Sequence, residues 1–164
     1  MIERELTPRD IDAVLAMQSA VHKRMARQDW LVETSREQFA YIFGGGGYGV
    51  GLFEGEALLG AWVLYYPFER EDALSRVMGL EEGKTAHYEL AMLDPSLRGQ
   101  GLHGKMVKKL TEHAAKDGRF AYIAATAHPD NQASVRGFTG SGYKVYDTRE
   151  MYGGVMRCIL YKKL

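Results

Sequence analysis

The stretch LDPSLRGQGLHGKM, residues 93–106, places glycines at two phosphate-binding spacings at once. Gly99, Gly101 and Gly104 give G-x-G-x-x-G, while Gly99, Gly104 and Lys105 give G-x-x-x-x-G-K. Both patterns put backbone N–H groups at the start of a helix, where unpaired donors and the helix dipole favour an anion. An acyl-CoA-binding turn uses the same backbone arrangement. The stretch therefore predicts a phosphate site and leaves three ligands to separate: a nucleoside triphosphate, a dinucleotide and an acyl-CoA.

Two of these ligands fit the surrounding residues poorly. A P-loop needs Ser or Thr after its lysine to bind magnesium, and Met106 stands there. A dinucleotide fold needs an acidic residue about twenty positions after the turn, where residues 124–126 read Ala-Ala-Thr. The roughly sixty residues after the turn are also too few for a second nucleotide-binding half. The sequence disfavours nucleotide hydrolysis and dinucleotide binding.

The composition narrows the class of protein. A chain of 164 residues can form one domain with a core, so we expect residues 1–164 to be a single domain. Basic and acidic residues both number 21, which gives no overall positive field for nucleic acid. No segment approaches the ~20 apolar residues that span a bilayer, and the N-terminal residues are charged. The one cysteine, Cys158, excludes a disulfide framework. We expect a cytoplasmic protein that binds neither nucleic acid nor membrane.

Hydrophobic periodicity and turn residues predict an α/β (α+β) order of elements. We expect a strand over 1–6, a helix over 7–25, a short helix over 36–42, a hairpin over 48–67 with its turn at 54–56, a strand over 85–93, a helix over 102–117, a strand over 119–127, a short helix over 131–140 and two terminal strands joined near 153–154. Residues 44–47 are interpreted as a flexible turn. Residues 68–84 are interpreted as a solvated loop, with a lid over an acceptor substrate as the alternative.

The turn resembles that of a known family, the GNAT superfamily of acyl-CoA-dependent N-acyltransferases. The family signature is Arg or Gln, two residues, Gly, one residue, then Gly or Ala. Arg98 and Gly101 match it, and His103 occupies the last small position with Gly104 beside it. The resemblance implies a mixed, mostly antiparallel central sheet with two splayed parallel strands and about four flanking helices.

The resemblance continues after the turn and implies acetyl-CoA as the cofactor. Residues 121–144, AYIAATAHPDNQASVRGFTGSGYK, resemble the family's next strand and helix. In such a site the N–H groups of the turn accept the pyrophosphate, Arg98 adds a charge-assisted contact, and strand backbone binds the pantetheine arm. The implied cofactor-binding residues are Ala91, Met92, Leu93, Arg98, Gly99, Gln100, Gly101, Leu102, His103, Gly104, Asn131, Ser134 and Phe138.

The strand before the turn carries the candidate catalytic residues. N-acylation needs a neutral amine, a base that takes its proton, and a polarised carbonyl group. His87 and Glu89 alternate onto one face of this strand, from which the family often takes its base. We expect Glu89 to be the base and His87 to be the second candidate. A structural carboxylate at Glu89, a packed His87 and a turn role for His128 are the alternatives. We expect no metal.

Position 138 departs from the pattern of the family. Many relatives place a tyrosine there, five residues before the closing aromatic, to protonate the leaving thiolate, and Phe138 cannot donate a proton. Tyr122 and Tyr152 are candidate substitutes. The sequence therefore predicts an N-acetyltransferase that acts on the primary amine of a small molecule or peptide, with segments 21–42 and 68–84 lining the acceptor site. The alternative is a catalytically degenerate acyl-CoA-binding or regulatory module. A homodimer is compatible with either.

Overall fold

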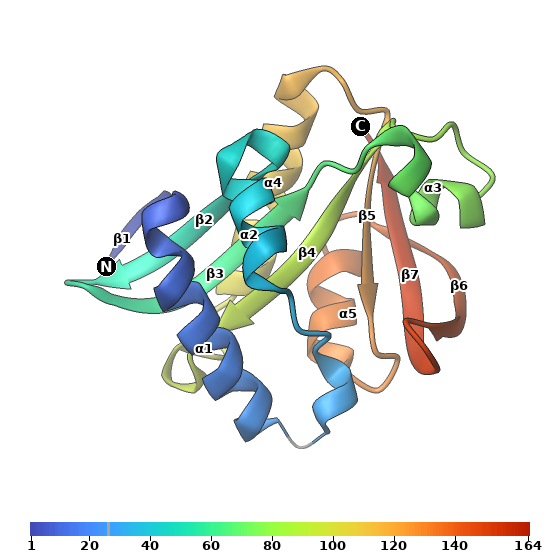
Figure 1. Ribbon diagram of the computed structural model, residues 1–164. Coiled ribbons are helices and arrows are strands. Elements are labelled where there is room, and N and C mark those ends of the chain that lie inside the picture. The colour runs from blue at the N-terminus through green and yellow to red at the C-terminus, as the bar shows by residue number, and fades with distance from the viewer. Residues whose placement is uncertain (26) are drawn as a thin grey trace. The chain divides into compact units, whose positions relative to one another are not determined.

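The computed structural model describes residues 1–25 and 27–164 of the chain (Figure 1). In these residues the elements are β1 (Ile2–Glu5), α1 (Ile11–Arg24), α2 (Arg36–Tyr41), β2 (Gly47–Glu54), β3 (Ala57–Tyr65), α3 (Ala73–Val77), β4 (Thr85–Leu93), α4 (Leu102–Asp117), β5 (Tyr122–Ala127), α5 (Gln132–Thr139), β6 (Lys144–Met151) and β7 (Val155–Lys163). The chain divides into two compact units. The first unit contains Met1–Tyr65 and Glu89–Leu102, and the second contains Tyr66–Tyr88 and His103–Leu164. A single domain over 1–164 stays a prediction.

The sheet of the first unit has the strand order β1-β2-β3-β4, and β4 begins in the second unit. β1 and β3 both pair antiparallel with β2, and the predicted hairpin turns at Gly55, whose φ is +60°. The glycine run before β2 was interpreted as a flexible turn, and this is partly wrong. Residues Ile42–Gly46 form a π-helical turn, and a Cβ at Gly47 would overlap the Leu64 carbonyl oxygen. Close backbone packing therefore requires that glycine.

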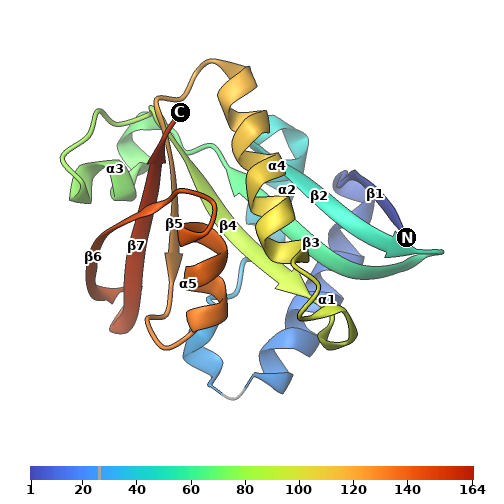
Figure 2. The same cartoon turned by 180° about the vertical axis from the view of Figure 1, so that it is seen from behind.

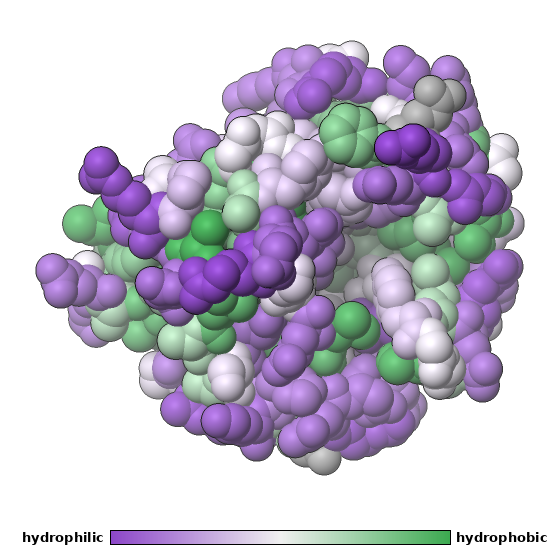
Figure 3. Space-filling view, in the orientation of Figure 1, coloured by the Kyte–Doolittle hydropathy of each residue, from purple (hydrophilic) through white to green (hydrophobic). Residues whose placement is uncertain are grey.

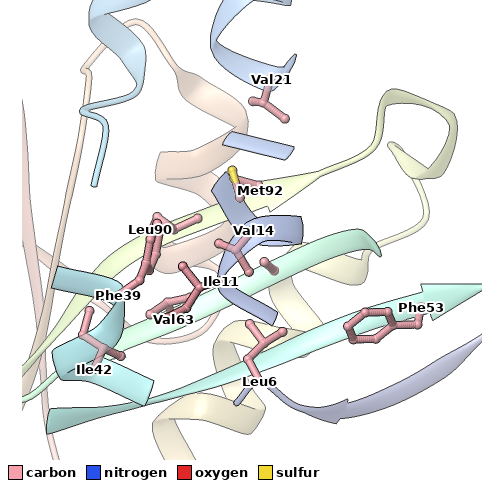
Figure 4. Packing of buried hydrophobic residues seen from close by; sticks show 11 residues of the cluster. Leu6, Ile11, Val14, Val21, Phe39, Ile42, Phe53, Val63, Leu90 and Met92 are labelled. Carbon is pink, nitrogen blue, oxygen red and sulfur yellow. The ribbon is translucent and has the colours of Figure 1, made fainter. Parts of the chain in front are cut away.

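The core of the first unit holds the second half of β4 in place. Figure 1 shows α1 and α2 covering one face of β2 and β3. Leu90 and Met92 of β4 lie among side chains from α1 and α2 (Figure 4). The other buried residues of this cluster are Leu6, Ile11, Val14, Val21, Phe39, Ile42, Phe53, Ala61 and Val63. Each large apolar side chain buried here stabilises the fold by about 1.5 to 3 kcal/mol. Glu89, Ala91 and Leu93 are only half-buried and alternate with Leu90 and Met92 along the strand.

The sheet of the second unit has the order β4-β5-β7-β6. β4 and β5 are parallel, with Thr85 opposite Tyr122 and His87 opposite Ala124, while β7 pairs antiparallel with both β5 and β6. Figure 2 shows α5 against β5 and β7. The mostly antiparallel sheet with one parallel pair confirms the predicted fold class. The splay of the parallel strands stays a prediction.

The prediction of a solvated loop over 68–84 is wrong in its middle part. Asp72 caps the short helix α3 by accepting the Ser75 N–H, and both residues are fully buried. Leu74 packs on Ala124 and Ile159 of the sheet. The described residues therefore contain five α-helices, where about four were expected. A helix of five residues is too short for a hydrophobic period to show in the sequence.

The surface shown in Figure 3 mixes hydrophilic and hydrophobic residues. Among the described residues, no helix combines the length and the apolar character needed to cross a bilayer. The same part of the chain holds no group of three or more His, Cys, Asp or Glu side chains able to bind a metal ion. Cys158 is free and buried, and burial raises the pKa of its thiol.

Candidate functional site

The glycine turn predicted to bind phosphate has an open, partly left-handed backbone. Gly99 and Gly101 have φ values of +77° and +72°, which only glycine adopts without strain. A Cβ added at Gly99, Gly101 or Gly104 would meet no heavy atom within 4 Å. Before the turn, the Asp94 carboxylate accepts the N–H and the hydroxyl of Ser96, at 2.9 and 2.6 Å. The capped turn thus presents bare backbone to its surroundings.

The first turn of α4 follows directly and adds anion-binding groups. The helix has 16 residues and begins at Leu102, so its first N–H groups lack helical partners and carry the positive end of the helix dipole. Arg98 and Gln100 are exposed at the entrance to this helix. Bare glycine backbone, the positive end of the helix dipole and one arginine together suit a diphosphate. The residues present therefore fit the pyrophosphate of coenzyme A.

The Glu89 carboxylate accepts a hydrogen bond inside the first unit. Its Oε1 lies 2.9 Å from the hydroxyl of Thr34, in the connection between α1 and α2. The Thr34 backbone in turn bonds the side-chain amide of Gln18, at 2.8 and 2.9 Å. Neither Thr34 nor Gln18 belongs to a functional motif, so their contacts here were not predicted from the sequence. Thr34 falls in segment 21–42, expected near the acceptor. Ala26 of that segment lies outside the described residues.

His87, the second predicted base, pairs with a buried carboxylate in the second unit. Its Nε2 lies 2.7 Å from Oδ1 of Asp72, which is 0% exposed. Asp72 also accepts the backbone N–H groups of Ser75 and Gly83, at 3.1 and 2.9 Å. Burial alone would raise the pKa of Asp72, but the hydrogen bonds from His87 and Ser75 and the attraction of His87 leave that pKa lowered. One nitrogen of His87 thus connects segment 68–84 to β4.

The polar residues at the start of α5 have local partners. Asn131 caps the helix, and its side-chain oxygen accepts the Ser134 N–H at 3.4 Å. His128 is buried, and its Nδ1 accepts the N–H of Asp130 at 3.1 Å. These bonds favour a turn role for His128. The predicted cofactor contacts of Asn131 and Ser134 stay predictions.

The predicted site residues divide between the two units. The first unit holds Glu89, Ala91, Met92, Leu93, Arg98, Gly99, Gln100, Gly101 and Leu102, and the second holds His87, His103, Gly104, Asn131, Ser134 and Phe138. Over residues 2–144 the chain matches the family described as the acetyltransferase (GNAT) domain. The chain belongs to the GNAT acetyltransferase family. Among curated proteins, no sequence matches it.

Solved structures of GNAT proteins share the fold at low sequence identity. A GNAT-family acetyltransferase from Streptococcus pneumoniae is 14% identical with a TM-score of 0.74, and the match covers 99% of each chain. The ribosomal-protein-alanine N-acetyltransferase of Brucella melitensis is 18% identical with a TM-score of 0.71 over 100% of both chains. The putative acetyltransferase yncA of Salmonella typhimurium, solved with its cofactor acetyl-CoA, is 16% identical with a TM-score of 0.72, over 100% of this chain and 94% of that one.

His103, which replaces the last small residue of the GNAT signature, directs its side chain into α5. Its ring stands perpendicular to the Phe138 ring, with centroids 5.4 Å apart, and a Cβ at Gly137 would overlap it. Burial lowers the pKa of His103, against a smaller opposite effect of its hydrogen bond to the Ser134 backbone. The imidazole is therefore neutral at pH 7 and sits where Gly137 leaves room. The glycine in α5 compensates for the bulky residue in the turn.

Gly137→Ala is expected to destabilise the fold by about 1 to 3 kcal/mol, because the added methyl group overlaps the His103 ring. His103→Ala in the same chain should recover most of that loss, since it removes the overlapping ring. The measurement is urea unfolding of both single variants and the double variant. Gly104→Ala is the matched control, because it lies in a helix with no atom within 4 Å of the new Cβ. Equal unfolding midpoints for Gly137→Ala and wild type would show that the ring does not occupy this space.

Phe138 lies in an aromatic cluster of the second unit and is only 3% exposed. Its ring centroid is 5.0 Å from that of Tyr88, 5.4 Å from that of His103 and 5.2 Å from that of Tyr143. These rings join α4, α5 and the first half of β4. Phe138 therefore has a packing role that the sequence pattern alone did not reveal, and its contact with the cofactor stays a prediction.

The two tyrosines beside Phe138, Tyr88 and Tyr143, both donate a hydrogen bond from their hydroxyl group to another residue. Tyr88 donates to the Val107 carbonyl at 2.8 Å. Thr111 gives its proton to the same carbonyl at 2.7 Å, so in the 2.6 Å contact between Thr111 and Tyr143 the tyrosine is the donor. Burial raises the pKa of Tyr88 well above its ordinary value and that of Tyr143 to about 12. Neither phenol is arranged to protonate a leaving group.

The two tyrosines named from the sequence as substitute acids lie elsewhere in the second unit. Tyr122 begins β5, and its ring is 6.4 Å from that of Tyr161. Tyr152 is 54% exposed in the turn between β6 and β7, where its φ is +50°. Neither residue contacts the Phe138 cluster through a described ring pair. The assignment of a general acid to either one stays a prediction.

Proposed function

We propose that this GNAT chain transfers the acetyl group of acetyl-CoA to the nitrogen of a primary amine on a small molecule or peptide. The observation that carries the proposal is the open glycine turn at the start of α4, with left-handed Gly99 and Gly101 beside Arg98. The yncA protein solved with acetyl-CoA supports the choice of cofactor. The Brucella relative, an N-acetyltransferase of a protein alanine, supports an amine acceptor. The free, buried Cys158 supports a reducing compartment, the cytoplasm.

The residues that would hold coenzyme A lie along β4 and the turn. Backbone N–H groups of Arg98–Gly104 would bind the pyrophosphate, and the Arg98 side chain would add a charge-assisted contact. The backbone of Ala91–Leu93 would bind the pantetheine arm. Asn131, Ser134 and Phe138 complete the proposed set. His103 would contribute through its backbone, because its side chain is turned toward α5.

Glu89 is the proposed base. Bound acetyl-CoA supplies an acetyl group on an activated thioester and a thiol that can leave. Glu89 would take the proton from the acceptor nitrogen, directly or through water, as the acetyl group passes from sulfur to that nitrogen. The hydroxyls of Tyr88 and Tyr143 already donate hydrogen bonds to other acceptors, so the departing thiolate would take its proton from water. His87 is the second proposed base.

The test of the function is release of free thiol from acetyl-CoA in the presence of a panel of amines and peptide N-termini. Mass spectrometry of the acceptor should show a gain of one acetyl group for each thiol released. Thiol release without an acetylated acceptor would indicate hydrolysis instead. Absence of both, at saturating acetyl-CoA, would contradict the proposal.

Arg98→Ala is expected to weaken coenzyme A binding by roughly 10- to 100-fold, the scale of one lost charge-assisted hydrogen bond. Titration calorimetry with coenzyme A measures this directly and needs no acceptor. Arg9→Ala is the matched control, because Arg9 is an exposed arginine of the same unit outside the turn. An unchanged dissociation constant in Arg98→Ala would remove this side chain from the site.

A second candidate function is an acyl-CoA-binding or regulatory module without turnover. The hydroxyls of Tyr88 and Tyr143 beside Phe138 donate hydrogen bonds to other residues. This favours the second candidate, because neither hydroxyl is then available to protonate a leaving thiolate. Tight binding of coenzyme A with no thiol release from any amine of the panel would select this candidate. Turnover with one amine would eliminate it.

A further inference from the structure

Thr34 joins three elements of the first unit. It lies between α1 and α2, one residue before Ser35, whose hydroxyl caps α2 by accepting the Gln38 N–H at 3.1 Å. The Thr34 hydroxyl donates to Oε1 of Glu89 at 2.9 Å, across 55 positions of sequence. Only 5% of the surface of Thr34 is exposed, so water competes little for this bond. The contact connects the backbone before α2 to the proposed base on β4.

Gln18 of α1 fixes Thr34 from the other side. The Gln18 side-chain oxygen accepts the Thr34 N–H at 2.8 Å, and its amide nitrogen donates to the Thr34 carbonyl at 2.9 Å. Gln18 is itself 4% exposed. Both backbone groups of Thr34 are therefore held by one buried side chain, in the way a neighbouring strand would hold them. The Thr34 hydroxyl is therefore attached to a backbone that Gln18 holds in one position.

A fixed hydroxyl donor restrains the carboxylate that accepts from it. The last torsion of a glutamate side chain is broad, so an unrestrained carboxylate samples many orientations. An ionised carboxylate can only accept, and a hydroxyl has one proton, so the bond from Thr34 selects the orientation that places Oε1 at that proton. Proton transfer depends steeply on such placement, and a 1 Å error can cost about 10² in rate.

We propose that Thr34 is a positioning residue for Glu89, and that Gln18 holds Thr34 in place. The inference rests on the proposed function, in which Glu89 is the base. It assigns supporting roles in the reaction to Thr34 and Gln18, which do not touch the reacting atoms. It also ties the connection between α1 and α2, expected to line the acceptor site, to the orientation of the base.

Thr34→Val tests the inference, because it removes the hydroxyl and keeps the shape of the side chain. We expect kcat to fall about tenfold, the effect of one lost hydrogen bond, with coenzyme A affinity unchanged. Thr34→Ser keeps a hydroxyl and should restore most of the rate. In the Glu89→Gln background, Thr34→Val should cause no further loss, since it acts through Glu89. If Thr34→Val fails to fold, Thr34→Ala takes its place.

Thr7→Val is the matched control: it makes the same substitution in the same unit, outside the segments expected to line the acceptor site, and removes a hydroxyl that donates to Asp10 at 3.3 Å rather than to Glu89. It should lower the melting temperature and leave kcat unchanged. Loss of activity in Glu89→Gln with full kcat in Thr34→Val would overturn the inference alone. A further loss on adding Thr34→Val to Glu89→Gln would also overturn it, by showing a structural effect. Full activity in Glu89→Gln, or no turnover by wild type, would overturn it together with the proposed base.

Discussion

Glu89→Gln is expected to lower kcat by about 10² to 10⁴, the usual contribution of a general base. Glutamine has the same shape and keeps an oxygen that can accept from Thr34, so the side chain should stay in place while losing its basicity. Coenzyme A affinity should change little, because the carboxylate is proposed to act in the chemical step. Steady-state kinetics with a saturating amine, together with calorimetric titration of coenzyme A, separate the two effects.

Glu56→Gln is the control for this variant. Glu56 is an exposed carboxylate in the turn between β2 and β3, in the same unit, and its loss should leave kcat unchanged. Full turnover by Glu89→Gln would place the base elsewhere. His87→Gln would then be the next variant, with the caution that His87 also pairs with Asp72.

Asp72→Ala is expected to destabilise the protein by about 3 to 5 kcal/mol, the usual cost of removing one partner from a buried pair. The substitution leaves the His87 side chain and two backbone N–H groups, those of Ser75 and Gly83, without their acceptor. Each unmet donor in a buried site costs free energy of unfolding. Urea unfolding at pH 7 measures the loss.

Asp12→Ala is the matched control, because its oxygen lies 2.7 Å from a nitrogen of Arg36, the same separation as in the Asp72–His87 pair. The side chains of Asp12 and Arg36 are 84% and 58% exposed, so water and salt screen their attraction and the variant should unfold almost like wild type. Equal losses for Asp12→Ala and Asp72→Ala would show that burial does not decide the strength of these pairs.

The stability difference between wild type and Asp72→Ala should also depend on pH. The pKa of Asp72 is lowered in the folded state relative to its unfolded value of about 3.9. A lowered folded pKa means that the contribution is fully present above the unfolded pKa and is lost as pH falls through the folded pKa. The contribution of the Asp72 carboxylate to the difference should therefore be lost as the pH falls below about 4. A difference that grows below about pH 4 would contradict this assignment.

The sequence predicted those parts of the fold whose signals are local. β4 at 85–93 and α4 at 102–117 have the predicted bounds, because Asp94-Pro95 ends the strand and an apolar face of helical period defines the helix. The glycine turn between them was also predicted from its spacing. Its left-handed φ values at Gly99 and Gly101 explain why those two positions carry glycine.

The partners of the candidate bases could not be predicted in the same way. Glu89 meets Thr34 across 55 positions, and His87 meets Asp72 across 15. Tertiary packing brings such pairs together. Neither Thr34 nor Asp72 belongs to a pattern of helical or strand period in the sequence. Asp72 was placed in a solvated loop because its segment is rich in acidic residues and lacks a clear period, and its pairing with His87 is not visible in the sequence.

The His103 ring occupies the space that a side chain at position 137 would need, and this affects how relatives of this chain can be recognised. A pattern that demands Gly or Ala at the position of His103 rejects this sequence, although its turn keeps the open backbone at Gly99 and Gly101. The overlap at Gly137 couples the two positions across 34 residues. Relatives should therefore fall into two sets, one with a small residue in the turn and a free choice in α5, the other with an aromatic ring in the turn and glycine in α5. A search pattern that couples both positions would recover members that the turn alone misses.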